Sequence, residues 1–234
     1  MKRCVLVLCA LGCAARPAPV PSGSPEPLAV PPSVRVGAAE VAPCSRQRAG
    51  DLLLEDAGSA DVVFVGGFGG WFTYRDQAGS SNVLAILPPD GFGGGGNAAR
   101  MHGRLASARR SYAGMGISLG NQPFDASMYR GVRFRARVAE GSSPKVRFTV
   151  SDIHTVPAGG LCTSCFNHFG ADLVLSRDWR GVELSFQDLK QAPGWGDPFP
   201  ALAVNAVYAL GWEPNEQGKS FDVWVDDIAF IGCR

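Results

Sequence analysis

The chain has 234 residues, a formal net charge of +1 and 18% charged residues. This balance excludes both the extended basic surface with which proteins bind nucleic acid and an acidic tail. Glycine (30 residues) and proline (17 residues) are frequent, and long helix-forming runs are scarce, which favours short strands joined by glycine-rich turns.

Residues 1–13 predict a secretory signal. A basic Lys-Arg pair precedes the apolar run Cys4–Leu11, which is too short for a membrane span of roughly 20 residues. The segment "ALGC" resembles the cleavage box of bacterial lipoproteins, and this resemblance implies that Cys13 is lipidated. Ala10 departs from the leucine preferred in that box, so ordinary cleavage near Ala14 or Ala15 is the alternative.

Residues 14–43 are rich in proline, serine and alanine and contain few large apolar side chains. Such a segment cannot bury enough surface to fold, and its prolines keep it extended. It is predicted to be a tether that holds a domain, residues 44–234, away from a membrane. The predicted location is therefore the bacterial cell envelope, with the chain exported and anchored by lipid in the outer membrane, or periplasmic or at the surface.

The cysteines outside the signal predict disulfides. Four remain after those in the signal and at its cleavage site are set aside, and an even number in an exported chain favours pairing. In one connectivity, the first bond closes a short loop and the second joins the two ends of the domain, although other connectivities are formally possible. This pairing is Cys162 with Cys165 and Cys44 with Cys233.

The segment "GGLCTSCFNHFG", residues 159–170, has the cysteine pair of a covalent staple, a haem anchor, a zinc site or a redox couple. A haem anchor needs C-x-x-C-H, and here the histidine is displaced to position 168. A zinc site needs further ligands, and the other histidines are His102 and His154. A thioredoxin-like couple needs a βαβ setting. The covalent staple is favoured, with metal and redox sites as alternatives.

Several segments alternate with a period of two, as half-buried strands do. In "VRFRARV" the apolar residues from Val132 to Val138 are predicted to face inward and the three arginines outward. Eight or more short strands predict an all-β fold, an antiparallel β-sandwich or jelly roll. The predicted strands are 61–65, 99–106, 114–119, 132–138, 145–152, 171–176, 181–187, 207–212 and 220–230.

The predicted outer strand faces carry arginine, acidic residues and tryptophan. A single arginine row is ordinarily a solvated surface. Here, however, these residue types recur on several strands. Guanidinium and carboxylate groups form paired hydrogen bonds with vicinal hydroxyls, and an indole packs against the C–H face of a sugar. The combination therefore suits carbohydrate.

Four motifs, "GGWFTYRD", "FDASMYRGVRFRA", "DWRGVELSF" and "VWVDDIAF", occur in this order. The series, from about Leu52 to Cys233, resembles family 11 carbohydrate-binding modules and related galactose-binding-like jelly rolls, especially those of exported bacterial lipoproteins. The resemblance implies a two-sheet sandwich whose concave face binds a polysaccharide or oligosaccharide. A monomer is expected.

The resemblance also implies a structural calcium ion where the first and last strands meet. Calcium takes six to eight oxygen ligands, often carboxylates and carbonyls. Matching positions make Glu55, Asp56, Asp61, Asp226 and Asp227 the predicted ligands. The segment "LEDAG" departs from the family's Phe-Glu-Asp-Gly pattern, and a plain surface acid is the alternative at each position.

The predicted sugar contacts follow from the same resemblance, since family members use tyrosine, arginine and aspartate rather than one fixed motif. The disulfide loop adjoins "SDIHTVPAGG" and is predicted to stiffen a wall of the cleft. The residues predicted to bind carbohydrate are Arg135, Arg147, Asp152, His154 and Trp212, with Tyr74 at the rim.

The predicted function is non-catalytic polysaccharide binding by a membrane-tethered, exported module. One alternative is a structural envelope lipoprotein that binds a protein partner, and another is a small glycan hydrolase. The sequence does not place two facing carboxylates, which a glycoside hydrolase needs. No catalytic residue is nominated.

Overall fold

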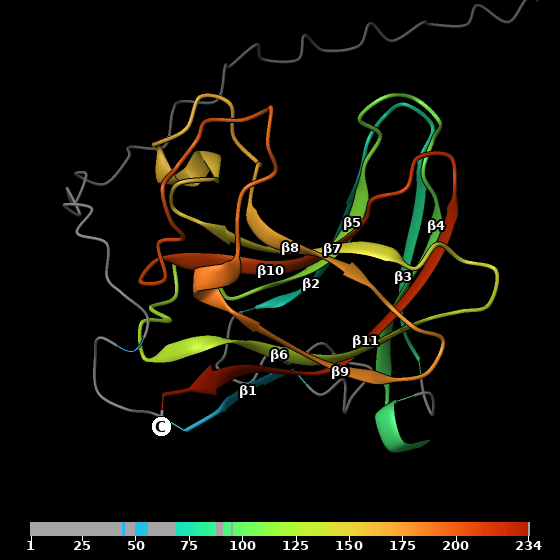
Figure 1. The fold of residues 1–234 in the computed structure, drawn as a ribbon, viewed down its shortest axis with the longest axis horizontal. Helices are drawn as coiled ribbons and strands as arrows, with labels where there is room; N and C mark the ends of the chain where they lie inside the picture. Colours follow the sequence, from blue (N-terminus) through green and yellow to red (C-terminus); the bar gives the residue numbers. More distant parts are fainter. Residues whose placement is uncertain (1–43, 45–49, 56–68, 88–90, 95, 234) are drawn as a thin grey trace, which may run out of the picture. The chain divides into compact units, whose positions relative to one another are not determined.

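Eleven strands form two antiparallel sheets in the described part of the chain (Figure 1). The computed structural model describes residues 44, 50–55, 69–87, 91–94 and 96–233, all within the compact unit Ala39–Arg234. The predicted signal with Cys13, the tether, Asp56 and the strand at residues 61–65 lie outside these residues.

One sheet has six strands. Five of them lie in the order β3-β4-β11-β6-β9, and β1 pairs with the C-terminal part of β11. The long strand β11 lies at its centre and pairs with three of the others. These strands are β1 (Leu52–Glu55), β3 (Ser81–Leu87), β4 (Ala98–Arg104), β6 (Tyr129–Val138), β9 (Arg180–Ser185) and β11 (Ser220–Gly232).

The other sheet has five strands in the order β2-β5-β10-β7-β8. Its strands are β2 (Gly70–Arg75), β5 (Ala113–Ser118), β7 (Lys145–Asp152), β8 (Phe169–Val174) and β10 (Val207–Pro214). Three short 3-10 turns complete the described elements, namely η1 (Phe92–Gly94), η2 (Pro157–Gly159) and η3 (Phe186–Asp188). No helix in the described residues is long and apolar enough to cross a membrane.

The core lies between the two sheets and is formed by alternate residues of each strand. Phe134 of β6 and Phe148 of β7 meet across it, with ring centroids 5.2 Å apart. Trp212 of β10 completes this cluster, 5.3 Å from Phe134 and 5.6 Å from Phe148. The predicted inward alternation of β6 and β7 and the predicted β-sandwich are both confirmed.

Both predicted disulfides are present. The Cys44–Cys233 bond joins residues 189 positions apart, and the Cys162–Cys165 bond closes a loop with a separation of 3. The Cys44 amide also donates to the Ser127 carbonyl oxygen at 3.0 Å. The first bond therefore ties the beginning of the described domain to the end of β11.

Candidate functional site

The outer face of the five-stranded sheet carries a row of small residues. Strand register places Phe72 opposite Gly116, Gly116 opposite Gly211, Gly211 opposite Thr149 and Thr149 opposite Gly170. The chain neighbours of Gly116, Gly211 and Thr149 are fully buried core side chains, so the row itself faces outward. Glycine within a strand leaves room for another group to approach the backbone closely.

Two aromatic rings occupy this room. A Cβ atom added at Gly116 would overlap the Phe72 ring, and one added at Gly114 would overlap the Tyr74 ring. The two rings are stacked with centroids 6.1 Å apart, and the Tyr112 ring lies 6.5 Å from that of Tyr74. Phe72, Tyr74 and Tyr112 form the surface that we call the aromatic platform.

The Tyr74 hydroxyl connects the aromatic platform to a buried carboxyl group. It donates a hydrogen bond to Glu213 Oε1 at 2.6 Å. Burial raises the pKa of Glu213, while the Tyr74 hydrogen bond and the Arg147 charge act in the opposite direction. Burial, followed by the proximity of Glu213, also raises the pKa of Tyr74 well above its ordinary value. Tyr74 is therefore a neutral donor at physiological pH.

A row of charged residues lies beside the glycines. Glu213 is opposite Arg147, and Arg147 is opposite Asp172, on three adjacent strands. Arg147 Nη1 lies 3.2 Å from Asp172 Oδ1, and its Nη2 donates to the Lys190 carbonyl oxygen. We call Glu213, Arg147 and Asp172 the polar row. Because their partners fix them, their remaining hydrogen-bonding atoms have defined directions.

A pocket of about 440 Å³ lies at the β8 end of the polar row. Its lining includes Arg147, Asp172 and the segment from Lys190 to Pro193. The amides of Gly170 and Lys190 each donate to the other's carbonyl oxygen at 2.9 Å. The segment that begins at Lys190 therefore extends the sheet beyond β8 and borders the pocket.

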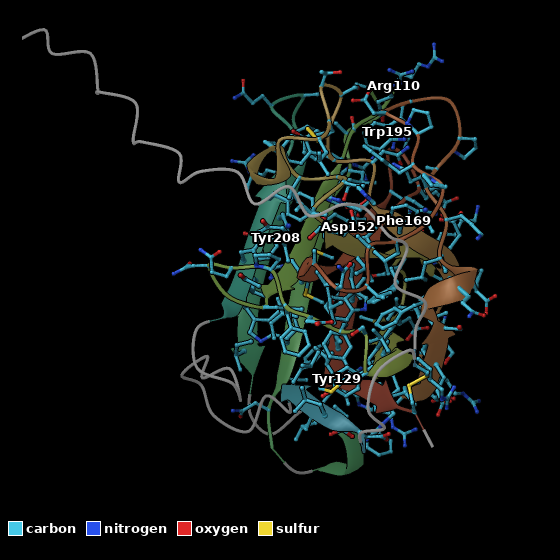
Figure 2. The ribbon with its side chains drawn as sticks, turned by 90° about the vertical axis from the view of Figure 1, so that its left-hand side faces the viewer. Arg110, Tyr129, Asp152, Phe169, Trp195 and Tyr208 are labelled. Carbon is cyan, nitrogen blue, oxygen red and sulfur yellow. A yellow bond between two sulfur atoms is a disulfide. The ribbon has the colours of Figure 1, made fainter. Side chains whose placement is uncertain are left out.

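Asp152 anchors the loops at one end of this sheet and is fully buried (Figure 2). Its Oδ1 accepts hydrogen bonds from the Thr155 amide at 3.1 Å and the Thr155 hydroxyl at 2.9 Å. Its Oδ2 accepts from the Ala203 amide at 2.7 Å. His154 stacks on Phe199 with ring centroids 4.7 Å apart, and the Asp152 carboxylate, 3.4 Å from His154 Nδ1, raises the pKa of His154.

The disulfide loop is fixed to a second loop by side-chain hydrogen bonds. Asp197 Oδ2 accepts from the backbone amides of Thr163 and Ser164, which lower the pKa of Asp197. Asn167 Nδ2 donates to the carbonyl oxygens of Ala192 at 2.8 Å and Trp195 at 2.7 Å. The two loops, which rise beyond β8 and β10 in Figure 1, therefore form one connected unit.

The predicted sugar-binding residues do not form one site. Tyr74 and Arg147 lie on the outer face of the five-stranded sheet, in the aromatic platform and the polar row. Arg135 pairs across strands with Asp226 and Gly181 on the outer face of the six-stranded sheet. Asp152 and His154 belong to the loop anchor described above.

The prediction that Trp212 contacts sugar is wrong. Trp212 is fully buried and packs against Phe134 and Phe148 in the core. Side chains alternate along β10, and its neighbours Gly211 and Glu213 face outward. Trp212 therefore faces inward.

Several residues of the face were not among the predicted contacts. They are Phe72, Tyr112, Thr149, Asp172 and Glu213. The segment "AGMGIS" offered a signal, because glycine at alternate positions of a strand leaves one of its faces bare.

The predicted calcium ligands are only partly described. Register pairs Glu55 with Ile228, so the backbone of the first strand lies beside Asp227. The Asp226 carboxylate accepts from the Phe92 amide at 2.7 Å and the Asp227 amide at 2.8 Å. Within the described residues no group of three or more His, Cys, Asp or Glu side chains could hold a metal. Asp56 and Asp61 lie outside them, as does the side chain of Glu55.

Solved structures of carbohydrate-binding modules have a fold similar to that of this chain. The family 11 module of the cellulosomal cellulase Lic26A-Cel5E of Clostridium thermocellum superposes with a TM-score of 0.60 at 16% identity, over 80% of this chain and 97% of that one. A family 11 module from the same organism, in complex with a β-1,3-1,4-mixed-linked tetrasaccharide, gives 0.58 at 17% identity, over 80% and 98%.

A family 30 carbohydrate-binding module also has this fold, with a TM-score of 0.53 at 15% identity over 79% of this chain and 100% of that one. No family model matches the sequence. No curated protein matches it either. The chain therefore has a family 11-like fold, which confirms the predicted resemblance at the level of architecture.

Proposed function

We propose that this chain binds a polysaccharide, without catalysing a reaction, across the outer face of its five-stranded sheet. The observation that carries this proposal is the aromatic platform beside the polar row on one sheet face. The structures with the same fold are carbohydrate-binding modules by name. Their likeness supports the class of ligand, and the two surfaces support its place on this chain.

The two surfaces suit different parts of a sugar. The exposed rings of Phe72 and Tyr112 can pack against the C–H faces of sugar rings. The polar row offers carboxylate oxygens and guanidinium N–H groups to vicinal hydroxyls. Five strands about 4.8 Å apart give this face a width of roughly 19 Å. A glycan lying across the strands would therefore extend from the aromatic platform at the β2 edge to the pocket at the β8 edge.

We also propose that the domain acts outside the cytoplasm, tethered to a membrane through Cys13. The two disulfides support an oxidising compartment. The basic dipeptide, the short apolar run and "ALGC" support export with lipid attachment. Mass spectrometry of the mature N-terminus tests this, because an unlipidated terminus at Ala14 or Ala15 would indicate ordinary cleavage.

The binding proposal is tested by affinity electrophoresis of the purified chain through gels that contain neutral polysaccharides, with mixed-linked β-glucan, xylan and mannan as probes. Retardation by one class would establish binding and name the ligand class. Migration unchanged in every gel would reject polysaccharide binding at this face and favour a protein-binding role.

A prediction with a matched control locates the neutral ligand. We expect Phe72→Ala to weaken binding of the retarding neutral polysaccharide about tenfold, since loss of one ring contact removes about 1.4 kcal/mol. Phe92→Ala is the control, because each of the two residues is 39% exposed but Phe92 lies against the other sheet. Isothermal titration measures both affinities. Equal weakening in the two variants would contradict this location.

A structural calcium ion remains a proposal, supported by the pairing of β1 with β11 beside Asp226 and Asp227. Calcium that binds only the native state would raise its stability by mass action. We expect 1 mM calcium to raise the melting temperature by several degrees above that measured in chelator, and Asp227→Asn to reduce this difference. Identical melting curves in calcium and in chelator would contradict a structural calcium site.

A further inference from the structure

The outer face of the six-stranded sheet carries arginines stacked between aromatic rings. Register places Arg100 opposite Trp224 and Trp224 opposite Arg137, on three adjacent strands. The Arg100 guanidinium lies 4.9 Å from the Trp224 ring centroid, and that of Arg137 lies 4.3 Å from it. Arg137 also lies 5.2 Å from the ring of Trp179, in the connection before β9.

A second arginine on the same strand is held in the same way. The Arg135 guanidinium lies 4.2 Å from the centroid of the Phe92 ring. Phe92 meets Trp179 edge to face, with centroids 6.5 Å apart, and its amide donates to Asp226 Oδ2 at 2.7 Å. The turn η1 is therefore fixed against the sheet, and its ring covers Arg135.

These two arginines differ from their neighbours in how their charge is compensated. Arg100 forms a two-point contact with Asp222 at 2.9 and 2.6 Å, and Arg133 lies 3.2 Å from Asp51. In the described part of the chain, neither Arg135 nor Arg137 has a carboxylate within 4.0 Å of its guanidinium. Rings hold these cations but leave their formal charge in place.

Asp226 is the carboxylate opposite Arg135 in the sheet register. Its two oxygens accept the backbone amides of Phe92 and Asp227 at 2.7 and 2.8 Å. Two N–H donors of this cluster, one of them on Arg137, also lack an acceptor among the described residues. Arg137 Nε and Trp224 Nε1 are buried and have no hydrogen-bond partner in the part of the chain that the structure describes. The guanidinium N–H groups of Arg135 and Arg137 are thus left without a carboxylate partner within the residues described.

Arg135 and Arg137 are two residues apart on one strand face, which separates them by roughly 7 Å. A guanidinium presents a planar fork that matches a carboxylate or a sulfate with two hydrogen bonds. Because stacking already orders both side chains, an anionic ligand would lose less affinity to side-chain ordering. The net charge of +1 does not suit the extended phosphate contacts of nucleic acid.

We propose that this face, Arg135 and Arg137 with Phe92, Trp179 and Trp224, is a second binding site that takes an acidic polysaccharide through its carboxylate or sulfate groups. We call it the arginine face. It lies on the opposite sheet from the aromatic platform and does not rest on the function proposed for that platform. One molecule would then hold a neutral and an acidic glycan at the same time.

The test is affinity electrophoresis of the full chain with heparin as the sulfated probe and polygalacturonate as the carboxylated probe. We expect retardation by at least one of them, decreasing as salt rises. The double variant Arg135→Gln/Arg137→Gln should lose at least about tenfold in affinity, since each contact is charge-assisted. The probe that retards the chain identifies the anionic group.

The matched control is Arg109→Gln/Arg177→Gln, which removes the same charge from two exposed arginines, one of them paired with Glu140 at 2.9 Å. It should retain most of the affinity. Arg135→Lys/Arg137→Lys keeps the charge but loses the fork, so an intermediate affinity is expected. Thermal melting of each variant shows whether it is folded.

Three results would overturn the arginine face. One is no retardation by either acidic probe, and another is equal loss in the Arg135/Arg137 and Arg109/Arg177 variants, which would indicate a general charge effect. The third is loss of acidic binding in Phe72→Ala, which would place the acidic ligand on the aromatic platform. Failure of neutral binding alone would reject the proposed function and leave the arginine face standing.

Discussion

The double variant Cys44→Ser/Cys233→Ser is expected to lose about 5 kcal/mol of unfolding free energy, the largest effect anticipated for this protein. The bond spans a separation of 189 residues, so its removal releases nearly the whole domain from a constraint on the unfolded chain. Urea denaturation of the variant and the parent under non-reducing conditions measures the difference.

The second disulfide supplies the control. Cys162→Ser/Cys165→Ser opens a loop with a separation of only 3, for which the same loop relation gives about 2 kcal/mol. Equal losses of unfolding free energy in the two variants would show that the stabilisation by these disulfides does not depend on loop length. The same variant tests the prediction that the Cys162–Cys165 loop stiffens part of the binding site. Unchanged glycan affinity and unchanged loop mobility would show that this disulfide has no part in binding.

The second large effect is expected at Trp212, where we predict that Trp212→Ala lowers the unfolding free energy by about 3–5 kcal/mol. Its ring is fully buried and touches Phe134, Phe148 and Trp71, the last with centroids 5.9 Å apart. Alanine would leave a cavity at the centre of the sandwich. Thermal melting and urea denaturation report the loss.

Trp195→Ala is the comparison for this variant. Trp195 is 45% exposed on the loop beyond β9, and its replacement should change stability by no more than about 0.5 kcal/mol. If Trp212→Ala kept its stability but lost glycan affinity, then the side chain would be a ligand contact and its buried position would be contradicted.

The alternation of apolar residues was sufficient to predict the sandwich and the inward faces of β6 and β7. It failed for β2 and β3. In β2, "GWFTYR", aromatic residues occupy both faces, because Trp71 packs on the core while Phe72 lies on the outer glycines. In β3, "SNVLAIL", the apolar run is nearly continuous and shows no clear period. Alternation therefore reveals a strand when its outward residues differ clearly from the apolar inward ones.

The sequence could not predict which residues share one face, because the alternation of apolar residues does not show which of the two sheets a strand joins. Arg135 of β6 and Arg147 of β7 follow the same alternating pattern in consecutive strands. The chain passes from one sheet to the other between these strands, so the two arginines lie on opposite outer faces. Residues that the sequence suggested as one site are thereby divided between two surfaces.

The glycines under the aromatic platform determine how this protein tolerates change. Binding surfaces are usually weakened when side chains are shortened, but the aromatic platform would also be disturbed by a single added carbon. A methyl group at Gly116 would meet both the Phe72 ring and the Leu210 carbonyl oxygen, the latter at 2.8 Å. The ring could move aside, whereas that carbonyl belongs to the paired strand β10. Even alanine, the smallest available replacement, would therefore disturb the surface from beneath.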